Sequence, residues 1–148
     1  MSDAALAELA TAIDARFDAI PDGDPASAAR AQLRAVGTGY VAFALDNPGL
    51  FHAAFLVHSD LENASSPAMS GPSGRSPLEL LGVALDQLVA SGVMPAERRP
   101  QAEFLAWSSV HGFALLLIDG PLRFLPRAEA DAVTQRVIDM VEAGLTCS

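Results

Sequence analysis

The chain has 148 residues, and 51% of them are hydrophobic, which suffices for one domain with a sizeable core. All nine basic residues are Arg, and 18 acidic residues outnumber them, so the formal net charge is −9. Nucleic-acid phosphates require clustered cations and anionic membranes repel acidic chains, so this composition argues against direct binding of either by the chain alone.

The first predicted helix runs from Ser2 to about Ile20, because apolar residues recur there every three or four positions. Prolines at both ends of residues 21–25 terminate it. A second helix is expected over about residues 26–46, with one apolar stripe formed by Ala29, Leu33, Val36, Tyr40 and Phe43.

Two glycines, Gly37 and Gly39, lie inside the second predicted helix. Each weakens a helix by ~1 kcal/mol relative to alanine, and tertiary packing must offset that loss. We therefore expect another part of the chain, or a ligand, to approach the helix closely at these positions.

A short third helix is expected from Asn47-Pro48 to about His58, with Asn47 as the N-cap and Pro48 at the first helical position. Its face carries Phe51, Ala54, Phe55 and His58. Residues 59–75 are rich in Ser, Pro, Gly and Asn and have no apolar periodicity, which predicts a long, mobile loop.

The fourth helix is predicted to begin after Ser76, because Ser76-Pro77-Leu78-Glu79 fits the capping-box pattern S-x-x-E. Leu78, Leu81, Leu85 and Leu88 form its apolar stripe. Gly92, followed by Val93 and Pro95, is typical of a left-handed cap at the C-terminal end of a helix.

The fifth predicted helix occupies most of residues 101–120 and can open at Pro100. No charged residue lies between Glu103 and Asp119, so we expect the other elements to wrap around this helix. The uncharged run is shorter than the ~20 residues that a membrane span requires. A last helix begins near Pro126 or Arg127, and the class is therefore all-α, with six main helices.

The fifth helix presents two kinds of surface. One face combines large rings and polar groups, as in small-molecule sites, and consists of Phe104, Trp107, Ser108, His111, Leu115 and Ile118. The adjacent face has smaller residues that allow another helix to approach, namely Leu105, Ser109, Gly112 and Leu116. His111 is open to two interpretations, a core histidine bonded to a neighbouring helix or a ligand contact, and Trp107 is equally compatible with plain core packing.

Several chemistries are disfavoured by spacing. The three histidines are not paired at i,i+4 with each other and no Cys spacing typical of zinc is present, so no metal or other cofactor is expected. Ser108 and His111 would have parallel side chains on a straight helix, and no G-x-S-x-G motif is present, so we do not expect an enzyme. Cys147 is the single cysteine, and no secretory signal pattern opens the chain, which together favour the cytoplasm.

Two motifs resemble the TetR family of transcriptional regulators. Trp107-Ser108-Ser109-Val110-His111-Gly112 matches a Trp-x-x-x-His-Gly subgroup, and Gly39 to Phe55, GYVAFALDNPGLFHAAF, is similar to the family's helix, Pro break and aromatic-rich short helix. The resemblance covers most of the chain and implies a C-terminal ligand-binding and dimerisation domain with about six helices. It also implies that the N-terminal helix-turn-helix head of the family is absent from these residues, because Ser2 to Leu9 resembles the helix that follows the head.

The resemblance implies a small apolar effector among the second to fifth helices and a homodimer formed by the last two. The expected ligand contacts are Tyr40, Phe51, Phe55, His58, Leu81, Leu85, Phe104, Trp107, Ser108 and His111. The expected dimer contacts are Gly112, Phe113, Leu116, Leu117, Val133, Val137, Met140 and Val141. Two alternatives remain, a stand-alone dimerisation module without a ligand and, last, a small α-helical hydrolase.

Overall fold

The computed structural model describes residues 2–56 and 70–146, and these residues are helical apart from short connections. The six main helices are α1 (Ser2–Asp18), α2 (Pro25–Asp46), α3 (Pro48–Leu56), α4 (Pro77–Ala90), α5 (Ala102–Ile118) and α6 (Arg127–Thr146). A short 3-10 helix, η3 (Ala96–Arg98), precedes α5 and was not predicted. The described residues contain no strand, so the predicted all-α class with six main helices is confirmed.

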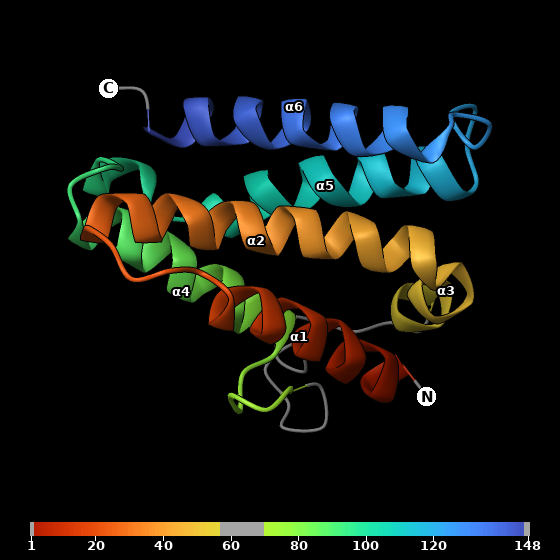
Figure 1. Cartoon of the computed structure of the whole chain (residues 1–148), viewed down its shortest axis with the longest axis horizontal. Coiled ribbons are helices and arrows are strands. Elements are labelled where there is room, and N and C mark those ends of the chain that lie inside the picture. Colours follow the sequence, from red (N-terminus) through yellow and green to blue (C-terminus); the bar gives the residue numbers. More distant parts are fainter. Residues whose placement is uncertain (1, 57–69, 147–148) are drawn as a thin grey trace.

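The helices pack around α2, which contacts each of the other five main helices. In Figure 1, α6 lies along one outer side of the molecule, α5 and α2 lie next to it, and α1 and α4 lie on the opposite side. α3 closes the end of the molecule at which α2 finishes. None of the described helices is long and apolar enough to span a membrane.

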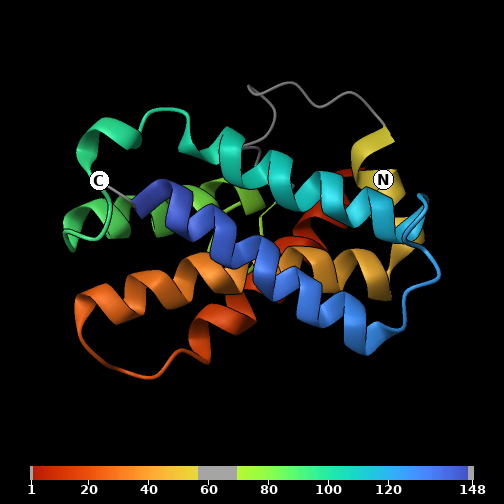
Figure 2. The same ribbon diagram turned by 90° about the horizontal axis from the view of Figure 1, so that it is seen from above.

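The position of α5 differs from the expectation that other elements wrap around it. One side of α5 is buried, through Ala106, Val110, Phe113, Ala114 and Leu117. The opposite side remains uncovered within the chain, where Leu105 and Leu116 are 61% and 42% exposed. α2, and not α5, is therefore the central helix, and α5 belongs to an outer pair with α6 (Figure 2).

Most of the predicted helix ends follow from local capping. Ser76 and Glu79 form the predicted capping box, with Ser76 Oγ accepting from the Glu79 N–H at 3.2 Å. Gly92 has a φ of +79°, as the predicted left-handed cap requires. Asn47 differs, because its Nδ2 donates to the carbonyl of Phe43 at 3.4 Å, so the side chain bonds the end of α2 and not the start of α3. α5 begins two residues after Pro100, at Ala102.

The close approaches expected at the two α2 glycines are present. A Cβ at Gly37 would lie 2.9 Å from Cγ1 of Ile138 on α6. A Cβ at Gly39 would lie 3.1 Å from Cδ of Arg16 on α1. Both contacts come from side chains of neighbouring helices, so each glycine allows a helix to pack closely on α2.

The long loop expected at residues 59–75 lies mostly outside the described residues, but its last part, 70–75, is described. It packs on α1, where the buried carboxylate of Asp14 accepts from the Ser73 N–H at 3.1 Å. A Cβ at Gly71 would lie 2.7 Å from Oδ2 of Asp14 and 2.9 Å from the backbone N of Thr11. The chain that leads into α4 is thus held tightly against α1.

Candidate functional site

A group of aromatic and polar side chains meets where α2, α3 and α5 come together. Tyr40 comes from α2, Phe51 from α3, and Trp107 and His111 from α5. Trp107 and His111 lie on one side of α5 because residues four positions apart are neighbours on a helix surface. We call these four residues the aromatic cluster.

Two hydrogen bonds join the polar atoms of the aromatic cluster. The indole Nε1–H of Trp107 donates to the hydroxyl oxygen of Tyr40 at 3.0 Å. The same hydroxyl lies 2.6 Å from Nδ1 of His111. The tautomer of His111 sets the direction of this second bond: the phenol donates to Nδ1 when the imidazole proton is on Nε2, and accepts when the proton is on Nδ1.

The rings pack around this chain of hydrogen bonds. Phe51 is fully buried, and its ring centroid lies 5.5 Å from that of Tyr40 and 5.4 Å from that of His111. Tyr40 and Phe51 meet edge to face, with an interplanar angle of 88°, an arrangement that aromatic quadrupoles favour. Each of the four side chains takes part in at least one further interaction, so none is without other partners.

Burial keeps both ionisable members of the cluster uncharged near neutral pH. It raises the pKa of the Tyr40 phenol, against a smaller opposing effect of the hydrogen bond from Trp107. Burial also lowers the pKa of the His111 imidazole below its usual value of 6.5. The cluster therefore offers polar atoms without net charge in an apolar setting, which suits an uncharged molecule better than an ion.

The other predicted ligand contacts lie elsewhere or outside the described residues. Leu81 and Leu85 of α4 are buried in the hydrophobic core. Phe104 is 43% exposed, and Ser108 is exposed with its hydroxyl donating to the carbonyl of Leu105, so neither joins the aromatic cluster. The Phe55 side chain and all of His58 lie outside the described residues.

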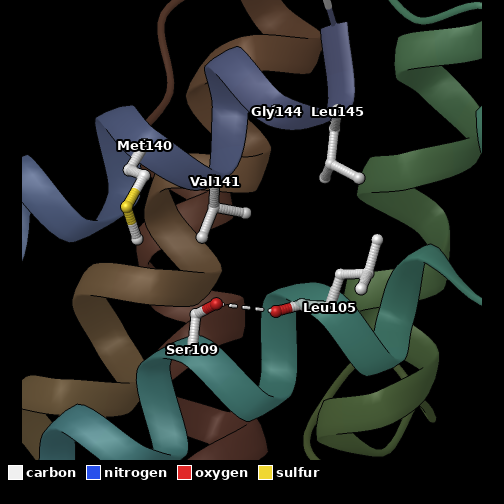
Figure 3. A pocket seen from close by; sticks show the side chains of 6 residues that line it. All are labelled: Leu105, Ser109, Met140, Val141, Gly144 and Leu145. Carbon is white, nitrogen blue, oxygen red and sulfur yellow. Dashed lines mark hydrogen bonds between the residues drawn. The ribbon is translucent and has the colours of Figure 1, made fainter.

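A second feature is the outer surface of α5 and α6. An open groove between the two helices is lined by Leu105, Ser109, Met140, Val141, Gly144 and Leu145. Figure 3 shows Leu105 and Ser109 on α5 opposite Met140 and Val141 on α6. Ser109 donates its hydroxyl to the carbonyl of Leu105, so the polar group on the α5 side of the groove is already bonded.

The predicted dimer contacts divide between this surface and the core. Leu116 and Met140 are 42% and 64% exposed, and a Cβ at Gly112 would meet no atom within 4 Å. Phe113 and Leu117 are buried inside the chain and do not contribute to this outer surface. The remaining three predicted contacts pack partly against the core, namely Val133, Val137 and Val141.

The sequence analysis did not identify two residues near the aromatic cluster and the outer surface of α5 and α6, namely His52 and Phe124. His52, which follows Phe51 of the aromatic cluster on α3, has its Nε2 3.0 Å from Oδ2 of Asp119 at the end of α5. Phe124, in the connection between α5 and α6, is 79% exposed and stacks under Arg123. No periodic signal could reveal either, because the first is a contact between distant residues and the second lies outside a helix.

The chain is thus a small all-α domain. It has polar groups among aromatic rings in its interior and an exposed apolar surface on α5 and α6. Residues 33–141 match the model of a family described as tetracyclin repressor-like, C-terminal domain. The chain belongs to this family, the regulatory C-terminal domains of TetR-like transcriptional regulators, because the match covers more than half of its length.

One solved structure shows the same fold. A protein with unknown function from Rhodococcus sp. RHA1 superposes with a TM-score of 0.75 at 22% sequence identity, over 98% of this chain and 69% of that chain. At this level of identity the likeness is one of fold alone. Among curated proteins, no sequence matches the chain.

Proposed function

We propose that this domain senses a small, largely apolar and uncharged molecule at the aromatic cluster and acts as a homodimer in the cytoplasm. In an intact regulator, ligand binding would alter the spacing of two DNA-binding heads. Such an effect requires the ligand to bind one arrangement of the domain more tightly than the other. The chain itself is not proposed to bind DNA or to catalyse a reaction.

The observation that carries the sensing proposal is the hydrogen-bonded chain Trp107–Tyr40–His111. It places three polar atoms at the contact of α2, α3 and α5, within an otherwise apolar region. A ligand that displaced or joined these hydrogen bonds would shift α5 relative to α2 and α3. The ring faces supply apolar contact, and the polar atoms supply orientation, which is the usual form of a small-molecule site.

Trp107 makes this proposal testable, because it is the only tryptophan of the chain. We expect uncharged apolar molecules, from medium-chain alcohols to two-ring aromatics, to change its emission and raise the melting temperature of the protein. The melting shift should disappear in His111→Ala and Trp107→Ala. Ser108→Ala on the exposed side of α5 is the control, and equal shifts in all three variants would place the site elsewhere.

The dimer proposal is supported by the distribution of exposed apolar side chains. Of the seven large hydrophobic residues exposed in the described part of the chain, six lie between Phe104 and Met140, and Leu50 is the exception. An apolar surface concentrated on two adjacent helices is typical of a protein contact. In a two-fold dimer the same surface of each copy would cover the other.

One observation favours the alternative of a dimerisation module without a ligand. The Trp107 indole N–H, the Tyr40 hydroxyl and Nδ1 of His111 already bond to one another, so the cluster can exist as part of the core. This alternative predicts the same dimer but no melting shift with any apolar molecule. The two proposals therefore separate in the ligand experiment and agree in the measurement of oligomeric state.

A further inference from the structure

The outer face of α6 carries two charged residues that have no charged partner within the described part of the chain. Arg30 and Arg34 of α2 bind Asp139 and Glu142 along one edge of α6. Arg127 binds Asp46 and Asp131 near the start of the helix. Glu129 and Arg136 are exposed, and neither forms an ion pair or hydrogen bond within residues 2–56 and 70–146.

Glu129 and Arg136 are both exposed and lie on the same face of α6. Seven residues are almost two full turns, so the two side chains differ by only about 20° in direction. They are separated by about 10 Å along the helix, too far to pair with each other. Between them lie exposed Ala132 and half-buried Val133, which leave room for a second helix.

We propose that α6 crosses α6 of a second copy in antiparallel orientation near Ala132, with Glu129 of each copy bound to Arg136 of the partner subunit. This inference rests on the proposed homodimer and specifies its register. In a two-fold contact, if one residue meets another, the reverse contact also forms, so a single arrangement makes both ion pairs. A parallel crossing would instead oppose like charges, Glu129 to Glu129 and Arg136 to Arg136.

The charge pattern favours a second copy over an unrelated partner. A face with one acidic and one basic group almost two turns apart, and with Ala132 and Val133 between them, is complementary to itself under a two-fold rotation. The face continues into Met140, which is 64% exposed and lines the groove shared with α5. The charged pairs would therefore set orientation, and the adjacent apolar surface would supply the larger part of the affinity.

Charge reversal tests this register. Glu129→Arg would oppose two pairs of arginines in the homodimer, and Arg136→Glu would oppose two pairs of glutamates. We expect each single variant to raise the dissociation constant of the homodimer by roughly tenfold, measured by sedimentation equilibrium. The double variant should return to within about threefold of the wild type, because its pairs are merely exchanged.

A mixing experiment makes the test independent of general charge effects. A heterodimer of Glu129→Arg with Arg136→Glu contains only opposite-charge pairs, so the mixture should associate more tightly than either variant alone. Glu8→Arg and Arg75→Glu are matched controls, because they make the same charge changes at exposed residues off α6 and should have little effect. Circular dichroism should show unchanged helix content in every variant, since neither side chain on α6 has an ion-pair or hydrogen-bond partner among the residues that the structure describes.

The outcomes separate this register from the dimer itself. A wild-type chain that stays monomeric at every concentration overturns the proposed homodimer and, with it, the register. A wild-type dimer whose affinity both single variants leave unchanged, with no preference for the heterodimer, overturns only the antiparallel α6 contact. A defect that the double variant does not repair also contradicts it, because only exchanged pairs can restore the contact.

Discussion

The Tyr40 hydroxyl lies 2.6 Å from Nδ1 of His111, and this contact joins α2 to α5 at the only place where an imidazole meets a phenol in the described residues. The hydroxyl also accepts from Trp107 at 3.0 Å, so one oxygen atom satisfies two polar groups of α5. Tyr40 is 5% exposed, so water has little access to replace either bond. The contact therefore joins the central helix to the outer pair of helices and is also the polar part of the proposed site.

Tyr40→Phe should destabilise the protein by about 1–3 kcal/mol, because it removes the hydroxyl and takes one partner from both Trp107 and His111. The free energy of unfolding can be measured by urea denaturation followed by circular dichroism, at a fixed protein concentration, because this signal remains when Trp107 is replaced. Tyr40→Phe combined with Trp107→Phe should cost less than the sum of the single changes, because both remove the same bond. Additive losses would contradict the role assigned to the hydroxyl.

His111 predicts a pH dependence of stability. Burial lowers its pKa in the folded state, so the unfolded chain binds a proton more readily. The contribution of neutral His111 is complete above the unfolded pKa of about 6.5 and is lost as the pH falls from there through the lower folded pKa. The free energy of unfolding should thus decline below about pH 6.5.

The comparison that isolates this effect uses His111→Gln, which keeps a polar side chain but does not titrate. Its free energy of unfolding should fall less than that of the wild type between pH 7.5 and 5. His52 pairs with Asp119 on the surface and serves as a reference, so His52→Gln should keep the wild-type decline that His111 causes. Identical slopes in the wild type and His111→Gln would contradict a lowered pKa at His111.

The periodicity of the sequence indicated which residues of α2 and α5 form the aromatic cluster, but it also assigned to the same face two residues that lie outside the cluster. Trp107 and His111 follow from their spacing of four residues, and Tyr40 from the apolar stripe of α2. Phe104 and Ser108 were assigned to the same face, yet they point to solvent. Each residue turns a helix by only about 100°, so the boundary between a covered and an uncovered side depends on where the neighbouring helices cross.

The central position of α2 illustrates what a single sequence leaves open. The charge-free run of α5 predicted burial on all sides, but an apolar face can equally be covered by a second copy, and composition does not distinguish the two. The glycines of α2 carried the better signal. Gly37 and Gly39 allow α6 and α1 to approach, which a helix at the centre of the domain requires.

Gly37→Ala tests this close packing. Alanine favours the helix by about 1 kcal/mol, but its Cβ would lie 2.9 Å from the buried Ile138, and overpacking of this kind costs about 1–3 kcal/mol. We expect a net destabilisation of about 1 kcal/mol, measured by urea denaturation. Gly37→Ala should destabilise the protein less when Ile138 is also changed to valine. Gly112→Ala is the control: a Cβ at Gly112 would meet no atom within 4 Å, so this change should not destabilise the isolated subunit.

Leu116→Asp tests the outer surface of α5. Leu116 is 42% exposed in the single chain, so the change has only a small direct cost for folding. In the proposed dimer it would bury a carboxylate against apolar side chains, which costs several kcal/mol unless the charge is paired. We expect sedimentation equilibrium to show a monomer at concentrations where the wild type is a dimer.

Leu50→Asp is the matched control, because Leu50 is 38% exposed and belongs to α3, not to the α5–α6 pair. It should leave the oligomeric state unchanged, which separates a general effect of surface charge from the loss of a specific contact. If Leu116→Asp remains a dimer as tight as the wild type, then α5 is not part of the contact between subunits. In that case the exposed apolar residues of α5 would need a partner other than a second copy, because six of the seven large hydrophobics exposed in the described residues lie between Phe104 and Met140.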